Sequence, residues 1–201
     1  MTAHDVREIA DIGADIDGPD CTARCVVAVI VTWRGRVGLF KRSQLVGHDA
    51  GAWHCITGYL DKDEDPMQRA AQELFEETGL CVADLEQLTR GPTLQLADPG
   101  GRRPWIVHTF AATTHRRHLM LNWEHDAYRW VRPAKVRRFH GRVPWLADVL
   151  DATMAYLGPE FSRRNQGAQP GNRCPARLLS SDRRVRPAAA SALPPEIACV
   201  K

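Results

Sequence analysis

Apolar and β-branched residues recur in short runs along most of the chain, a pattern typical of β-strands. A run over residues 25–33 ends at Arg34-Gly35, a dipeptide suited to a hairpin turn, and a second run follows over residues 36–41. Further strands are predicted over residues 53–57, 80–96, 105–112, 119–122 and 127–131, with a turn at 98–101. The last two of these strands are expected to pair with each other.

Two segments carry the period of an amphipathic helix instead, at residues 66–78 and 144–157. The first has clear boundaries, because Asp65 is a good N-cap, Pro66 suits the first helical position and Gly79 suits the residue just past the end. Strands, an inserted helix, more strands and a closing helix predict an α+β fold built as an α/β/α sandwich.

The length and composition predict one globular domain with an appendage, since 44% of the 201 residues are hydrophobic. Residues 1–21 are polar and irregular, residues 22–157 form the domain, and residues 158–201 form a basic, proline-rich tail that is expected to be disordered. The tail holds eight basic and three acidic residues, a net charge of +5, which leaves −2 for the rest of the chain. Because the rest of the chain is mildly acidic, a nucleic-acid partner is not expected.

Several classes of protein are excluded or disfavoured. The longest apolar run, residues 25–31, is too short to cross a bilayer, so no membrane is expected as a partner. The first twenty residues hold six acidic side chains and no apolar stretch of signal-peptide length. The six cysteines include no Cys-x-x-Cys pair, which disfavours a zinc framework. We therefore expect a cytoplasmic protein with reduced cysteines.

Three glutamates share one side of the first predicted helix. Glu73, Glu76 and Glu77 lie at i, i+3 and i+4, and residues 74–80 hold no lysine or arginine. Like charges at these spacings cost roughly 0.2–0.5 kcal/mol per pair. Spacing alone leaves two interpretations equal: a solvated acidic face, or a carboxylate site for a hard divalent cation such as Mg²⁺ or Mn²⁺.

The stretch from Gly58 to Leu80 resembles the Nudix box, whose pattern is Gly, five residues, Glu, seven residues, then Arg-Glu-U-x-Glu-Glu-x-Gly-U with U aliphatic. Eight of the nine specified positions match, and Gln72 stands where the box has arginine. The resemblance extends over about residues 22–157. It implies the family's α/β/α sandwich with a mixed β-sheet, and hydrolysis of a nucleoside diphosphate linked to another moiety X.

The resemblance also implies roles for particular residues. Mg²⁺ or Mn²⁺ would be held by Glu73, Glu76 and Glu77 with a backbone carbonyl at Gly58. Glu124 lies six residues ahead of Trp130 and resembles a late family glutamate that serves as metal ligand or base. Either Glu73 or Glu124 would take the proton from the attacking water. The partner is then a small nucleotide or another diphosphate, and a homodimer is left open.

Residues around these carboxylates are expected to support them. The box arginine pairs with and orients the carboxylates in the family, whereas Gln72 brings no charge. Arg69 lies at i, i+4 from Glu73 and is expected to reach it and partly replace that arginine. Glu64 is expected either to steady the loop before the helix or an outer metal-bound water, or to be a plain acidic residue favoured at a helix N-terminus. Trp105 is the candidate for stacking on a nucleobase.

Three alternatives stay open. Gln72 supports a Nudix-fold module that binds a nucleotide without cleaving it. Cys55, three residues before Gly58, would suit an enzyme resembling isopentenyl diphosphate isomerase, although a buried strand thiol is the simpler interpretation. A purely structural, partner-binding domain is the least favoured, because the carboxylate cluster points to a metal.

Overall fold

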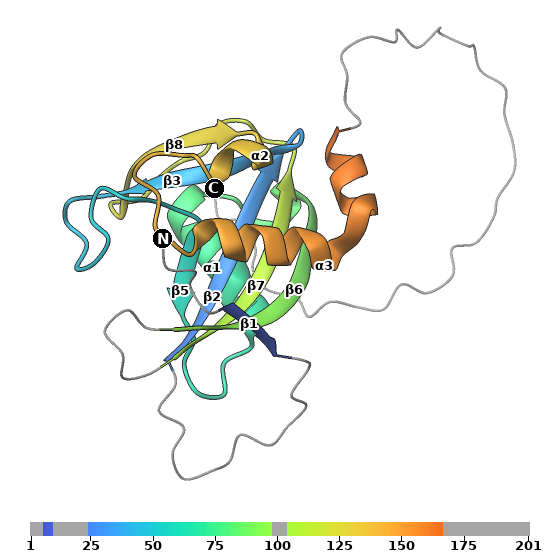
Figure 1. The fold of residues 1–201 in the computed structure, drawn as a ribbon. Helices are drawn as coiled ribbons and strands as arrows, with labels where there is room; N and C mark the ends of the chain where they lie inside the picture. Colours follow the sequence, from blue (N-terminus) through green and yellow to red (C-terminus); the bar gives the residue numbers. More distant parts are fainter. Residues whose placement is uncertain (1–5, 10–23, 98–103, 167–201) are drawn as a thin grey trace, which may run out of the picture.

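The computed structural model describes residues 6–9, 24–97 and 104–166, with side chains over 24–97 and 104–158 (Figure 1). Its strands are β1 (Val6–Ile9), β2 (Arg24–Trp33), β3 (Arg36–Arg42), β4 (Trp53–His54), β5 (Ile56–Tyr59), β6 (Leu85–Leu96), β7 (Trp105–Thr114) and β8 (His125–Val131). Its helices are α1 (Pro66–Thr78), a 3₁₀ turn η1 (Val82–Asp84), α2 (Pro133–Val136) and α3 (Leu146–Gln166).

The strands form one mixed sheet in the order β1-β6-β7-β2-β3-β4, with β5 also paired to β2 and β8 to β3. β2 and β7 are parallel, whereas the other pairs are antiparallel. β2 pairs with β3 at its C-terminal end and with β5 nearer its N-terminal end, on the same edge. This arrangement confirms the predicted mixed sheet and places the residues that follow β5 beside the centre of the fold.

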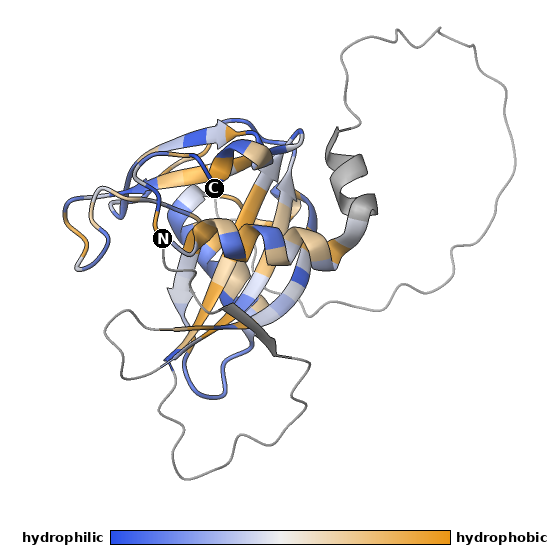
Figure 2. Cartoon of the chain, in the orientation of Figure 1, coloured by the Kyte–Doolittle hydropathy of each residue, from blue (hydrophilic) through white to orange (hydrophobic). Residues whose placement is uncertain are grey.

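Helices α1 and α3 cover opposite faces of the sheet (Figure 1). Alternate residues of β2 point to the two sides: Ala28 and Ile30 pack in the cluster that contains α3, and Val27 and Val29 pack in the cluster that contains Leu74 of α1. Burial on both faces explains the continuous apolar run of this strand (Figure 2). The α/β/α sandwich is confirmed.

The ends of α1 lie where the sequence predicts them. The Asp65 carboxylate accepts hydrogen bonds from the backbone N–H of Met67 (2.7 Å) and Gln68 (3.0 Å). Gly79 adopts φ 68°, a left-handed conformation that favours glycine, and its N–H donates to the Phe75 carbonyl. Leu74 is fully buried, which contributes about 1.5–3 kcal/mol. The caps therefore fix where the helix begins and ends, and with it the position of each glutamate along the helix.

The structure also corrects several boundaries. Strand β1 lies inside the segment predicted to be irregular, where it pairs with β6. The segment 80–96 opens with η1 before β6 begins. Helix α3 starts later than predicted and runs to Gln166, with a non-helical Gly158 (φ 72°, ψ 177°) inside it. The turn at 98–101 and the tail beyond residue 166 lie outside the described residues.

The strand predicted over residues 119–122 is wrong. Leu119 and Leu121 supply its apolar alternation, but they pack against the α1 side of the core without pairing to a strand. The Met120 N–H donates instead to the Thr78 carbonyl (3.0 Å) at the end of α1. β8 pairs with β3 rather than with this segment. Apolar alternation predicted burial here but not the partner that satisfies the backbone.

Within the described residues, no helix combines the length and hydrophobicity needed to span a membrane.

We expect residues beyond Gly158 to be dispensable for stability. The α3 side chains in the core are Leu146, Ala147, Val149 and Leu150, all well before the break at Gly158. A chain ending at Gly158 should therefore melt within about two degrees of the full chain and keep its activity. Thermal unfolding of both chains checks this, and a marked drop in Tm would show that the tail packs on the domain.

Candidate active site

Helix α1 presents two buried carboxylates and one exposed carboxylate. Glu73 and Glu77 are 5% and 2% exposed, whereas Glu76 lies in the exposed row of the helix. Glu73 reaches the backbone of β5 because Gly58 has no side chain: a Cβ atom there would overlap the Glu73 carboxylate. The three glutamates thus share one side of the helix, as predicted, but only Glu76 faces solvent freely.

Burial raises the pKa of both buried carboxylates. Burial raises the pKa of Glu73, partly offset by Arg69, and burial together with repulsion from Glu73 and Glu124 raises the pKa of Glu77 far above its ordinary value. A buried carboxyl group in this position either holds a proton or requires a cation beside it. Arg42 favours the ionised form of Glu77 but does not offset the other effects.

The donor set fits a hard divalent cation. Oxygen ligands are what Mg²⁺ and Mn²⁺ prefer, and Glu73 lies against the Gly58 backbone and contacts Glu77. Among the described residues, no three His, Cys, Asp or Glu side chains already converge as a closed cage. The fit therefore rests on the buried carboxylates and the glycine that gives them access to the β5 backbone.

Arg69 links two of the predicted residues. Its guanidinium forms an ion pair with Glu73, as expected from the i, i+4 spacing, and lies 3.9 Å from the Glu64 carboxylate. Glu64 in turn accepts a hydrogen bond from the Asp61 N–H (3.1 Å), across the loop before α1. Glu64 therefore contacts both the loop and Arg69. Gln72 lies on the exposed side, where its Nε2 donates to Glu76 Oε1 at 2.8 Å.

Glu124 approaches the same carboxylates from the loop before β8. Its backbone carbonyl accepts a hydrogen bond from the Ser43 N–H (2.7 Å), and its N–H donates to Asn122 Oδ1 (3.0 Å). Its charge raises the pKa of Glu77, so the two groups share one electrostatic environment. The structure thus places Glu124 within electrostatic range of Glu77 and in the same pocket as Glu73, although Glu124 lies about fifty residues from both in the sequence.

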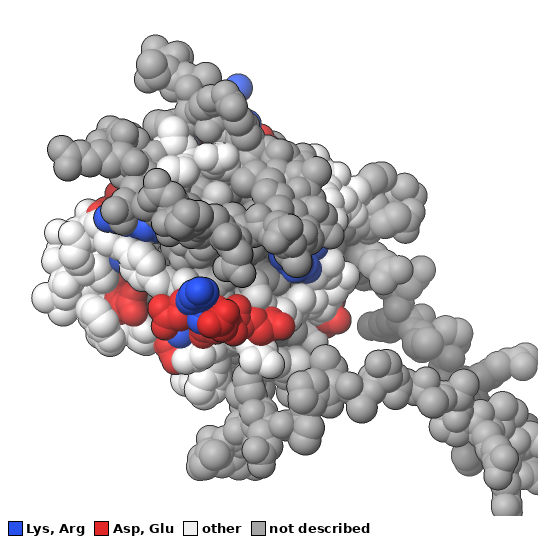
Figure 3. All heavy atoms as spheres, turned by 90° about the horizontal axis from the view of Figure 1, so that it is seen from below, with Lys and Arg blue, Asp and Glu red and all other residues white. Residues whose placement is uncertain are grey.

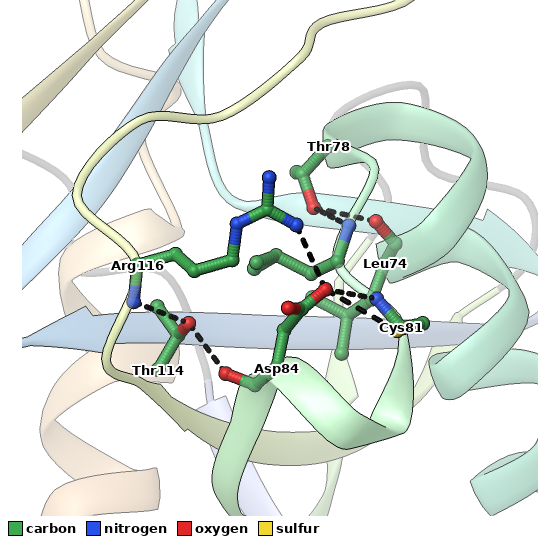
Figure 4. A network of polar contacts seen from close by, with 7 residues as sticks. Leu74, Thr78, Cys81, Asp84, Thr114 and Arg116 are labelled. Carbon is green, nitrogen blue, oxygen red and sulfur yellow. Dashed lines mark hydrogen bonds and ion pairs between the residues drawn. The ribbon is translucent and has the colours of Figure 1, made fainter. Parts of the chain in front are cut away.

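A polar network anchors this loop to the end of α1 (Figure 4). Asp84 accepts hydrogen bonds from the Cys81 N–H (3.1 Å) and from Arg116 Nη1 (2.9 Å). The Thr114 hydroxyl donates to the Asp84 carbonyl (2.8 Å), and the Thr78 hydroxyl donates to the Leu74 carbonyl (2.5 Å). Together with the Met120–Thr78 bond, these contacts hold both acidic segments at one corner of the fold.

A pocket of about 550 Å³ opens beside the carboxylates. Glu73, Gly58 and Glu124 line it, along with three arginines at positions 24, 42 and 69. Figure 3 shows the wider charge distribution, with acidic side chains gathered in one band and basic ones set among them. Arginine guanidinium groups beside a carboxylate site suit a phosphorylated ligand whose oxygens contact both the arginines and a cation.

Trp105 lines the pocket, as expected of a stacking residue. The Arg24 guanidinium lies over its ring at 5.2 Å, and the Tyr59 ring lies 6.0 Å away at an interplanar angle of 38°. Arg102 and Arg103, its neighbours in the sequence, fall outside the described residues.

Arg42 is one of the pocket residues that the sequence analysis missed. It ends β3, is 5% exposed, and its Nε donates to the His48 carbonyl at 3.2 Å. The strand predicted over residues 36–41 ends one residue short of it. The available signal was an arginine directly after a mostly buried strand. A register shift between Lys41 and Arg42 means that the alternation along β3 does not predict which face of the sheet the Arg42 side chain points to.

Cys55 gives no support to an isomerase. It is 1% exposed and does not line the pocket, and burial raises the pKa of its thiol to about 12. The thiol behaves as a small core side chain.

His54 makes the fold sensitive to acid. Burial lowers its pKa to about 4, and its ring packs edge-on against Trp145 at 4.7 Å. Because this value lies below the 6.5 of an unfolded histidine, stability is complete above pH 6.5 and is lost as the pH falls towards 4. Between pH 7 and 4.5, we expect wild type to lose about 2–3 kcal/mol more unfolding free energy than His54→Phe. Urea unfolding at both pH values measures this, with exposed His118→Phe as control. Equal losses in wild type and His54→Phe would contradict the prediction.

The fold and site define a class: a mixed-sheet sandwich in which a capped helix and a late loop present carboxylates beside a pocket that arginines also line. The chain belongs to the Nudix family, since the NUDIX domain matches residues 22–152.

Individual relatives are more distant. An octanoyltransferase from Myxococcus xanthus is 37% identical over 126 residues, 58% of this chain, but the match spans only 32% of that protein. An RNA pyrophosphohydrolase from Cereibacter sphaeroides (strain KD131 / KCTC 12085) is 23% identical over 69% of this chain and 91% of that protein. The NUDIX domain of Shewanella oneidensis NrtR, solved with ADP ribose, has a TM-score of 0.55 and 16% identity over 68% of this chain and 90% of that chain. This last likeness shows the fold.

Proposed function

We propose that this protein is an Mg²⁺-dependent hydrolase that cleaves the diphosphate linkage of a nucleoside diphosphate joined to another moiety X. The observation that carries the proposal is the buried pair Glu73 and Glu77, which lies with Glu124 beside a pocket of about 550 Å³. A divalent cation relieves the repulsion of such a pair. A small-molecule nucleotide is the proposed substrate, in keeping with the cytoplasmic location expected from the sequence.

The residues that would hold the cation are Glu73, Glu76 and Glu77, together with the Gly58 carbonyl. When bound, Mg²⁺ (or Mn²⁺) neutralises the charge of the diphosphate and increases the acidity of the attacking water.

Glu124 is proposed as the residue that takes the proton from the attacking water. Glu73, the other candidate, is held in an ion pair with Arg69 beneath Gly58. The Glu124 carboxylate lines the pocket and has no ion pair among the described residues. The Ser43 and Asn122 contacts fix the Glu124 backbone, so the strand end that carries the carboxylate is in place before substrate binds.

The arginines of the pocket are proposed to bind and orient the phosphates. Arg42 and Arg69 flank the carboxylates, and Arg24 lies against Trp105 farther along the wall. A diphosphate bound between Arg42 and Arg69 would direct the nucleoside or X towards Trp105 and Tyr59. Stacking on Trp105 would then require the substrate to share the ring with Arg24.

Phosphate release from a panel of substrates tests the proposal. The panel contains nucleoside triphosphates, dinucleoside polyphosphates, nucleotide sugars and a 5′-triphosphorylated RNA, each assayed with Mg²⁺ and with excess chelator. A Glu77→Gln protein purified in parallel controls for contaminating phosphatases. We expect chelator-sensitive turnover of at least one small nucleotide. Turnover of the RNA alone would contradict the small-molecule assignment.

A nucleotide-binding module without hydrolysis is the second candidate, and Gln72 favours it because the box arginine is missing. Calorimetric binding of a nucleotide together with no turnover across the panel would establish this alternative and overturn the first.

We expect Arg69 to replace part of the function of the arginine that the Nudix box has at position 72, where this chain has glutamine. Arg69→Ala removes the ion pair that orients Glu73, and loss of such orientation costs about 10- to 100-fold in activity or metal affinity. Gln72→Arg places a cation beside Glu76, the present partner of Gln72, and should raise the rate. Steady-state rates check both variants, with exposed Arg90→Ala as the matched control. Unchanged rates for both would show that Arg69 is only a surface residue.

A further inference from the structure

His125 is a buried histidine that lacks hydrogen-bond partners. It is the first residue of β8, its side chain is fully buried, and neither Nδ1 nor Nε2 has a partner within the described structure. Buried polar atoms are nearly always paired, so two orphaned ring nitrogens in one side chain require an explanation. The candidate roles assigned above do not use this residue.

The ring of His125 is held in one orientation. β8 pairs with β3 so that His125 lies opposite Arg42, and the ring packs edge-on against Phe40 at 5.6 Å and 62°. In this position Nδ1 lies 3.5 Å from Glu77 Oε2. Both groups are buried, so water does not readily replace either one as the other's partner.

The His125 ring directs Nδ1 towards Glu77, and Arg42 lies opposite His125 across the β3–β8 pair. A neutral imidazole has one N–H donor and one acceptor nitrogen. Glu77 is therefore faced by a group that can donate one hydrogen bond without adding a charge.

We propose that His125 is a positioning residue for Glu77: its Nδ1–H donates to Glu77 Oε2 and holds that carboxylate in the orientation that binds a divalent cation. This inference rests on the metal site of the proposed function. Carboxylates that bind metals are themselves commonly hydrogen-bonded, and such partners orient them. Shortening the 3.5 Å separation to hydrogen-bond distance needs a movement of less than about 1 Å, which a rotation of the Glu77 side chain supplies.

The arrangement also joins the two acidic segments of the site. His125 follows Glu124 directly, so the residue that contacts Glu77 on α1 is carried by the same strand end as the proposed proton acceptor. A shift of β8 would then change the orientation of Glu77 and the position of Glu124 together.

Mn²⁺ titration by calorimetry of the full chain tests the inference without using turnover. His125→Phe keeps the edge-on ring contact and removes the donor, and we expect it to weaken Mn²⁺ binding by about 10- to 100-fold. His125→Asn places an amide N–H near the position of Nδ1 and should restore affinity to within about threefold. His108→Phe, a half-buried histidine on β7 that does not line the pocket, is the matched control and should bind as wild type does.

Proton NMR of the wild type gives a second, independent measurement. Addition of Mg²⁺ should slow the exchange of the His125 ring N–H with water, and the resonance should be missing from His125→Asn. This readout remains if His125→Phe fails to fold.

The outcomes are distinct. Wild-type affinity in His125→Phe, or a ring N–H unaffected by Mg²⁺, overturns the positioning role while the metal site stands. Weak binding by both His125→Phe and His125→Asn also overturns it, since packing alone would then explain the loss. No Mn²⁺ binding by wild type overturns the metal site and this inference together.

Discussion

Replacing Glu77 with glutamine should lower turnover by more than about 100-fold, because a direct metal ligand should matter at least as much as the partners that orient it. The change removes a carboxylate that is 2% exposed and whose pKa is raised by burial and by its neighbours Glu73 and Glu124. Glutamine keeps the shape and has no charge, so the metal-free variant should be as stable as wild type or more stable. Adding Glu76→Gln should deepen the loss of Mn²⁺ affinity.

Calorimetric Mn²⁺ titration and thermal unfolding of the same samples separate these effects. Exposed Glu86→Gln, on β6, is the matched control. Equal Mn²⁺ binding by wild type and the double variant would show that the buried carboxylates do not hold the cation. A large fall in Tm would show that Glu77 supports the fold and would make the loss of turnover uninformative about binding.

Glu124→Gln should lower kcat by about 10²- to 10⁴-fold, the range typical for loss of a general base. Its backbone contacts with Ser43 and Asn122 involve main-chain atoms and should persist in the variant. We therefore expect Mn²⁺ affinity to stay within about tenfold of wild type, in contrast to Glu77→Gln.

Rapid-quench rates and Mn²⁺ titrations distinguish the two roles that family resemblance leaves open for Glu124. Asp126→Asn, an exposed carboxylate two residues away, is the control. A parallel loss of rate and metal affinity would make Glu124 a ligand. An unchanged rate would transfer the role of proton acceptor to Glu73.

Local sequence signals predicted the part of the site that is continuous in the chain. Asp65, Pro66 and Gly79 define α1 by short-range rules, and the i, i+4 spacing predicted the contact between Arg69 and Glu73. The resemblance added the sandwich and the mixed sheet. Glu124 became a candidate because its distance from Trp130 resembles the family pattern, and the spacing alone has no such meaning.

Local sequence signals could not predict which residues the pairing of distant strands brings into the site. Arg42 and His125 lie opposite each other only because β3 and β8 pair, and the sequence suggested instead that residues 119–122 were the partner of β8. The irregular register at Lys41 and Arg42 further separates side-chain direction from simple alternation. The burial of Glu77 was missed for the same reason, because its neighbours come from distant segments.

The network around Asp84 has a consequence for how the protein could lose its activity. Asp84 and Thr78 connect the last turn of α1 to the segment that carries Glu124, through Arg116 and Met120. Fraying of that turn would release Glu77 together with the Arg116 and Met120 contacts of this segment, while the Ser43 contact would still hold Glu124. Hydrogen exchange at this corner therefore reports how often the last turn of α1 and the segment before Glu124 open together.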